Sequence, residues 1–136
     1  MARNRQDDRF RVAVHRRLEP GETIVATARV WTARRTRLPA LAARYRDDAV
    51  VTDRRLMMWE CGWWTRRPRR RVLAERLGDI TVANMTDRSR SLRSGPVTRM
   101  RVDRAGRPSL VLELSRTERD QRFANALLTA GARVPA

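Results

Sequence analysis

A dense run of arginines carries the clearest chemistry in this sequence. Residues 65–71 comprise one threonine, one proline and five arginines, with no acidic residue among them. Guanidinium groups bind phosphate through paired hydrogen bonds, and a cluster of them attracts polyanions over longer distances. The chain has 31 arginines and no lysine against 15 acidic residues, which gives a formal net charge of +16. These features predict an anionic partner, which could be a nucleic acid, an anionic membrane or an acidic protein.

Two adjacent tryptophans, Trp63 and Trp64, precede the arginine run. Indole rings beside basic residues suit a membrane interface, where they lie at the depth of the headgroups. The same pair suits stacking on the bases of single-stranded nucleic acid. A third interpretation is that at least one of the two rings covers the core or an oligomer contact. Trp31 and Trp59 fall inside apolar segments and are expected in the core.

Residues for catalysis or metal binding are scarce. His15 is the single histidine and Cys61 the single cysteine, and no set of His, Cys and carboxylates has the spacing of metal ligands. The sequence contains neither a phosphate-binding loop nor a dinucleotide fingerprint. We therefore expect a protein that is not an enzyme and has no metal and no cofactor. Asp53, in a Thr-Asp-Arg-Arg turn, is expected to accept backbone N–H groups that hold a hairpin.

Length and composition favour one globular domain. A chain of 136 residues with 41% hydrophobic residues can bury a core without disulfides or metals. The first residues lack the apolar stretch of a secretory signal, and no apolar run is long enough to span a bilayer. We therefore expect a cytoplasmic protein, which could lie peripherally on the inner face of the membrane.

Hydrophobic periodicity predicts the elements that must position the arginines. Residues 7–18 form a short helix with Phe10 and Val14 on one face, and residues 118–130 form a longer amphipathic helix. The second helix begins with a capping pair, either Ser115 with Glu118 or Thr117 with Asp120. Short strands are expected at residues 23–31, 49–52, 56–59, 72–76, 79–86, 97–102 and 109–115. The fold class is therefore mainly β: about seven antiparallel strands in a small barrel, closed by the C-terminal helix.

Three short motifs fit this order of elements. Residues 18–22 match the pattern L-x-P-G-E, residues 50–56 match V-x-T-D-x-R-L, and residues 77–80 end in Asp-Ile. In this order, and followed by a closing helix, they resemble the bacterial pleckstrin-homology-like (PH-like) domains and their GRAM-like relatives. The resemblance implies a basic N-terminal extension at 1–18, a PH-like domain at 19–131 and a tail at 132–136. The chain departs from the pattern in its long first loop and its arginine content.

The arginines fall in the predicted loops. We expect the first, third and sixth loops of an up-and-down sheet on one side. Their arginines are Arg34, Arg35, Arg37, Arg66, Arg67, Arg69, Arg70, Arg71, Arg104 and Arg107. The resemblance implies that this is the end at which many PH-like domains bind phosphorylated lipid headgroups. The alternative is that arginine fills any solvated loop of this protein, as Arg88, Arg90 and Arg93 in the fifth loop indicate.

These observations lead to one functional hypothesis and two alternatives. The hypothesis is a non-catalytic PH-like adaptor whose arginine-rich loops bind an anionic lipid surface or an acidic protein. The first alternative is a nucleic-acid-associated protein that contacts phosphates with the same arginines and stacks bases on Trp63 or Trp64. The second is a scaffold subunit of a larger assembly. Homo-oligomerisation stays open.

Overall fold

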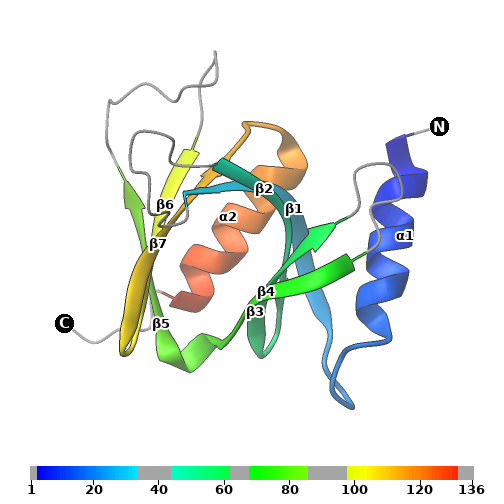
Figure 1. The fold of residues 1–136 in the computed structure, drawn as a ribbon, viewed down its shortest axis with the longest axis horizontal. Helices are drawn as coiled ribbons and strands as arrows, with labels where there is room; N and C mark the ends of the chain where they lie inside the picture. The colour runs from blue at the N-terminus through cyan, green and yellow to red at the C-terminus, as the bar shows by residue number, and fades with distance from the viewer. Residues whose placement is uncertain (1–2, 34–43, 62–67, 86–97, 132–136) are drawn as a thin grey trace.

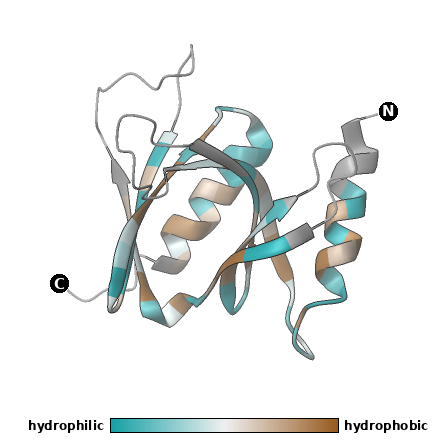
Figure 2. Cartoon of the chain, in the orientation of Figure 1, coloured by the Kyte–Doolittle hydropathy of each residue, from teal (hydrophilic) through white to brown (hydrophobic). Residues whose placement is uncertain are grey.

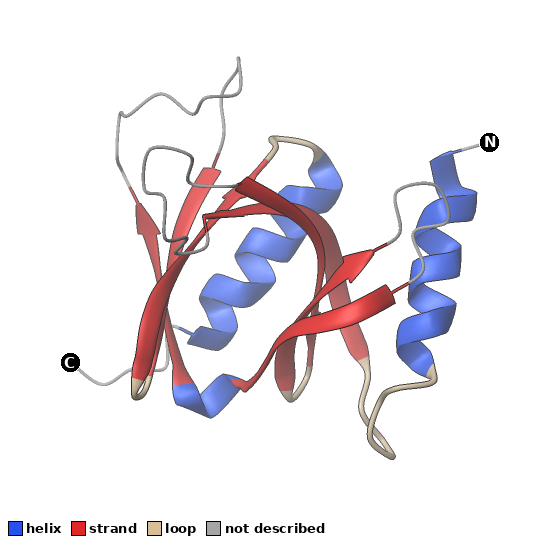
Figure 3. Cartoon of the chain, viewed as in Figure 1, coloured by secondary structure: helices blue, strands red, loops and turns tan. Residues whose placement is uncertain are grey.

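The computed structural model describes residues 3–33, 44–61, 68–85 and 98–131 (Figures 1 and 3). A helix comes first, seven strands follow, and a second helix ends the described chain. The elements are α1 (Arg3–His15), β1 (Ile24–Ala33), β2 (Arg44–Thr52), β3 (Arg55–Cys61), β4 (Pro68–Arg76), the 3-10 helix η2 (Leu77–Asp79), β5 (Ile80–Met85), β6 (Thr98–Arg104), β7 (Arg107–Leu114) and α2 (Glu118–Gly131).

The seven strands form one antiparallel sheet in the order β4-β3-β2-β1-β7-β6-β5. The sheet is strongly bent, and β4 and β5 are its two edges, joined by η2 at a corner (Figure 1). Helix α2 lies against the concave side and fills the space between the two halves. The prediction of seven antiparallel strands packed on a C-terminal helix is confirmed, although no ladder between β4 and β5 closes the sheet in the described chain.

The main core lies between α2 and the concave side of the sheet. Phe123 and Leu127 of α2 are fully buried, among Val30, Met100 and Leu112 of the sheet. The predicted apolar stripe of the second helix is therefore confirmed, because these two positions face inward at fourfold spacing. The helix begins at the second of the two predicted capping pairs. The Thr117 hydroxyl accepts the Asp120 N–H, and the Asp120 carboxylate accepts the N–H and hydroxyl of Ser115.

Helix α1 covers part of the convex side. Phe10 and Val14 are buried against Met57 and Trp59 of β3, and the Phe10 ring meets the Trp59 ring edge-on at 6.1 Å. With both sides of β2 and β3 covered, successive residues on these strands are apolar instead of alternating (Figure 2). The predicted apolar face of the first helix is confirmed. Trp59 is buried as expected, but beneath α1, whereas Trp31 is partly exposed.

Two local details differ from the predicted pattern. Strand alternation would place Ile24 on the same side as Ala26, but a bulge between them turns Ile24 toward α1 and leaves Val25 55% exposed. Strand β4 begins at Pro68, not at Val72, so Arg69, Arg70 and Arg71 belong to a strand. Residues 68–71 belong to the strand because they pair with β3. The pattern of apolar residues alone does not predict this pairing.

Candidate anion-binding surface

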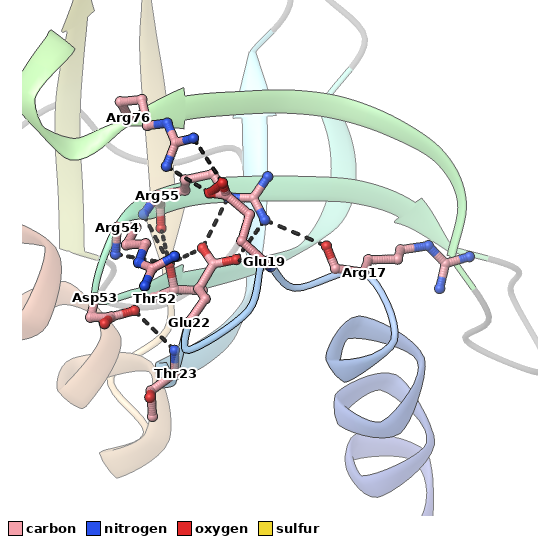
Figure 4. A network of polar contacts seen from close by, with 9 residues as sticks. All are labelled: Arg17, Glu19, Glu22, Thr23, Thr52, Asp53, Arg54, Arg55 and Arg76. Carbon is pink, nitrogen blue, oxygen red and sulfur yellow. Dashed lines mark hydrogen bonds and ion pairs between the residues drawn. The ribbon is translucent and has the colours of Figure 1, made fainter.

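Two of the sequence motifs meet in one ion-pair cluster beside the β2–β3 turn (Figure 4). The Glu22 carboxylate is fully buried and accepts hydrogen bonds from Arg55, at 2.9 Å from Nε and 2.6 Å from Nη2. The Thr52 hydroxyl donates to the same carboxylate at 2.7 Å. These bonds, that of Arg55 foremost, outweigh burial and lower the pKa of Glu22 to about 2. The carboxylate therefore stays ionised and holds the entry to β1 against the start of β3.

A second pair extends the cluster to β4. Arg76 Nη2 donates a hydrogen bond to Glu19 Oε2 at 2.9 Å, and Arg76 Nη1 forms an ion pair with Glu19 Oε1 at 2.7 Å. The bond from Arg76 is the main cause that lowers the pKa of Glu19. Both guanidinium groups of the cluster, on Arg55 and Arg76, are thus paired with carboxylates. This cluster therefore organises the fold.

The β2–β3 turn uses Thr52 and Asp53 in separate roles. The Thr52 hydroxyl accepts the N–H groups of Arg54 and Arg55, at 3.1 and 2.8 Å. Asp53 does accept a backbone N–H, as predicted, but from Thr23 at 2.9 Å, and its own N–H donates to the Thr23 carbonyl. The prediction that Asp53 itself holds the hairpin is therefore wrong. Thr52 holds the turn, while Asp53 fastens it to the segment before β1.

Several predicted site residues lie outside the described residues. They are Arg34, Arg35, Arg37, Trp63, Trp64, Arg66 and Arg67, together with the side chain of Arg69. Their roles in anion binding, membrane contact or base stacking stay predictions.

Arg70 and Arg71 lie near the start of β4 and project to opposite sides of the sheet. Arg70 stands opposite Glu60 in the ladder with β3 and pairs with it at 3.1 Å. Arg71 stands opposite Trp59, on the side that α1 covers. It is exposed and pairs with no carboxylate among the described residues. Of this pair, Arg71 is the one whose charge is uncompensated.

Arg104 and Arg107 flank the β6–β7 turn at a different place. Both guanidinium groups approach Glu75, at 3.6 and 3.1 Å from its Oε1. Glu75 lies four residues beyond Arg71 along an extended strand, which is about 13 Å. The expectation that the sixth loop lies with the third is wrong for these residues. The sixth connection of an up-and-down sheet lies at the end opposite to the first and third, so the β6–β7 turn lies near the C-terminal end of β4 and not near its start (Figure 1).

Uncompensated arginines are concentrated on α1 more than in the described parts of the predicted loops. The prediction from loop positions missed this helix. Among the described side chains, seven arginines pair with no described carboxylate, and four of them lie on or next to this helix. The seven are Arg9, Arg11, Arg16, Arg17, Arg54, Arg71 and Arg116. Asp8 is the one described acid between residues 8 and 17. The sequence did contain a signal, because arginines occupy the positions of this helix that the apolar face leaves free.

The geometry of α1 directs part of this charge away from the protein. Phe10 and Val14 face the sheet, so Arg9 and Val12 lie on the opposite side of a helix that turns 100° per residue, and the exposed Arg16 follows directly after its last residue. Val12 is 54% exposed. We define the α1–β4 basic face as the exposed residues Arg9, Arg11, Val12, Arg16, Arg17 and Arg71. A face of this kind combines long-range attraction for anions with an apolar contact at its centre.

Two other features are absent from the described part of the chain. No group of three or more His, Cys, Asp and Glu residues that could hold a metal ion occurs there. No helix in these ranges is both long and apolar enough to cross a membrane.

Comparison with known proteins identifies the fold. No protein-family model and no curated sequence matches this chain. A solved structure of the Slm1 PH domain matches with a TM-score of 0.56 and 15% identity, over 80% of this chain and 98% of that one. The same domain in complex with phosphoserine matches with a TM-score of 0.54 and 14% identity, over 80% and 96%. Its complex with inositol-4-phosphate gives 0.51 and 14%, over 79% and 96%. The chain therefore has a PH-like fold.

Proposed function

We propose that this protein is a non-catalytic PH-like adaptor that docks on an anionic membrane surface through the α1–β4 basic face. The observation that carries the proposal is the separation of charge: arginines of the sheet are mostly paired with carboxylates, whereas those of this face are not. Each arginine near an anionic membrane contributes about 1 kcal/mol, so five of them suffice for reversible docking without a lipid pocket. The location would be peripheral, on the inner side of the membrane.

The structural neighbours agree with this chemistry. Slm1 PH domains were solved with phosphoserine and with inositol-4-phosphate, and both ligands carry a phosphate. Phosphate is also the group that arginine binds best at a lipid surface. In this proposal Arg66, Arg67 and Arg69, which precede Arg71 in sequence, add to the same face. Arg34, Arg35 and Arg37 of the first predicted loop, and Trp63 and Trp64, are proposed as further contacts.

A membrane is favoured over nucleic acid by the apolar residue within the basic face. Val12 lies on the outward side of α1 between Arg9 and Arg16, and an exposed valine has no partner on a phosphate backbone. In the headgroup region of a bilayer, the same side chain buries apolar area while the arginines contact phosphates. An acidic protein would also bind arginines, and it is one outcome of the test.

Binding to vesicles and to DNA across a salt series tests the class of partner. The protein is mixed with phosphatidylcholine vesicles that contain or lack phosphatidylglycerol, and separately with duplex and single-stranded DNA. We expect binding to the anionic vesicles that weakens with salt, because screening acts over about 8 Å at physiological ionic strength. Val12→Asp should weaken vesicle binding more than DNA binding.

The opposite pattern would establish the nucleic-acid alternative. Binding to DNA without binding to anionic vesicles, at every salt concentration, contradicts the proposal. Trp63→Ala and Trp64→Ala then show which contact these residues make. A membrane contact predicts weaker vesicle binding, whereas base stacking predicts weaker binding to single-stranded DNA. Failure to bind either ligand would direct the search to an acidic protein.

A further inference from the structure

A groove at the other side of the molecule has no part in the proposed docking. It has a volume of about 850 Å³ and lies between the last turns of α2, the β2–β3 turn and η2. Its apolar lining includes Val25, Val51, Ile80, Ala126 and Ala130. This volume falls within the range of pockets that hold small organic ligands, about 300–1,000 Å³.

Small residues and a bulge create the groove. The β1 bulge turns Val25 outward, where it is 55% exposed and lines the groove. Helix α2 presents Ala126 and Ala130, one turn apart, where larger side chains would fill the space. Gly78 on the corner adds room, since a Cβ at this position would meet no atom within 4 Å. The result is an exposed apolar floor between rigid elements.

One arginine at this groove has an uncompensated charge. Arg54 is partly buried, and its guanidinium pairs with no carboxylate among the described residues. It lies close to Gly21, where an added Cβ would be 3.2 Å from Arg54 Nη2, so the turn at Gly21 leaves room for it. Arg76 also lines the groove but is paired with Glu19. Asp53 lines it too, with Oδ1 turned to the Thr23 N–H (Figure 4).

We propose that this groove binds a single-chain fatty acid, with the acyl chain on the apolar floor and the carboxylate on Arg54. The two parts of the ligand match the two parts of the groove. An acyl chain removes Val25 and the alanine floor from water, and a guanidinium binds carboxylate through two parallel hydrogen bonds. The Asn125 and Thr129 side chains, which also line the groove, lie on the exposed side of α2.

Calorimetric titration with laurate, below the concentration at which it forms micelles, tests the proposal on the full chain. We expect saturable binding of one laurate per chain. Arg54→Gln should weaken it about tenfold, the loss of one charge-assisted bidentate contact. Arg116→Gln is the matched control, since Arg116 is exposed and likewise unpaired among the described residues, and it should leave binding unchanged. Val25→Asp, which places a negative charge on the floor, should abolish binding, and thermal unfolding verifies that each variant is folded.

Further arms separate this site from the basic face and from other occupants. The combined Arg9→Gln and Arg16→Gln variant should bind laurate normally, so a failure of membrane docking does not affect this result. Methyl laurate should bind at least about tenfold more weakly, because the ester carries no charge for Arg54. Equal binding of laurate by the parent and Arg54→Gln, or no saturable binding, overturns the proposal. If the parent chain dimerises and Val25→Asp abolishes the dimer, the groove binds a second copy of the chain, and this result also overturns the proposal.

Discussion

At the scale of single residues, Glu22 is the centre of the fold's polar framework. Its carboxylate is fully buried, accepts both bonds of Arg55 and also binds Thr52, so it joins the segment before β1 to the β2–β3 hairpin. A buried carboxylate depends on such partners because burial alone disfavours its charged form. The Glu60–Arg70 pair, near the other end of β3, is exposed and has no such role.

Replacing Glu22 should therefore destabilise the protein strongly. We expect Glu22→Gln to lower the free energy of unfolding by about 2–4 kcal/mol, because Arg55 loses its buried partner. Glu60→Gln is the matched control and should cost less than about 1 kcal/mol, as exposed ion pairs do. Urea denaturation at neutral pH measures both. Equal effects of the two variants would show that the Glu22 cluster is not a structural framework.

The pKa of Glu22 also predicts how stability depends on pH. The pKa falls from its ordinary value of 4.5 to about 2 in the folded state, so the unfolded chain binds the proton more readily. The contribution of this carboxylate is complete above about pH 4.5 and is lost as the pH falls through about 2. Between these values the parent should lose stability more steeply than Glu22→Gln. Parallel curves of unfolding free energy against pH would contradict this assignment.

The sequence indicated this region but not its pairing. Residues 50–56 predicted a turn, and Asp53 was recognised as a backbone acceptor. The partner of Glu22 is 33 residues away, and in a chain with 31 arginines no spacing singles out Arg55. The choice depends on the sheet register, which places Thr52 and Arg55 next to the entry of β1.

At the scale of elements, the two helices cover opposite sides of one sheet. Periodicity predicted both, because Phe10 and Val14, like Phe123 and Leu127, recur at fourfold spacing. It could not predict that α1 packs on the convex side of β3. The continuous apolar run from Leu56 to Trp59 was the available signal, since a strand with both sides buried has no reason to alternate.

Substitutions on the two sides of α1 test whether Phe10 fixes this helix to the sheet. Phe10→Ala deletes a buried ring that contacts Trp59, and we expect a loss of about 3–5 kcal/mol in the free energy of unfolding. Val12→Ala, on the exposed side of the same helix, should change it by less than about 0.5 kcal/mol. Chemical denaturation of both variants gives the comparison. A small effect of Phe10→Ala would mean that α1 is not fixed to the sheet.

The closing helix provides a second test at this scale. Phe123 is fully buried in the core on the concave side of the sheet. We expect Phe123→Ala to cost about 3–5 kcal/mol, and to lower the thermal midpoint accordingly. Leu128 is only partly buried and is the control, with a smaller loss on substitution by alanine. An unchanged midpoint for Phe123→Ala would contradict the packing of α2.

At the scale of the whole molecule, charge is sorted between a neutralised sheet and an exposed helix. Carboxylates of the sheet pair with Arg99, Arg101 and Arg107, and the acids of α2 pair with its own arginines. Among its described side chains, helix α1 has one acid, and Arg9 and Arg11 pair with no described carboxylate. Net charge and the arginine run predicted a polyanion partner, but not this placement. The loop prediction failed for Arg104 and Arg107 because alternate connections are the first, third and fifth, so the sixth lies at the end of the sheet where β4 finishes and Arg107 meets Glu75.

Two variants of equal charge test the central claim most directly. The first replaces Arg9, Arg16 and Arg71 of the basic face by Gln, and the second replaces the paired, exposed Arg101, Arg107 and Arg122. Flotation with phosphatidylglycerol-containing vesicles measures their binding. At about 1 kcal/mol per arginine, we expect the first variant to bind roughly 100-fold more weakly than the parent, and the second to change by no more than about threefold. Equal losses in both variants would show that net charge alone drives binding and would contradict a docking surface on α1 and β4.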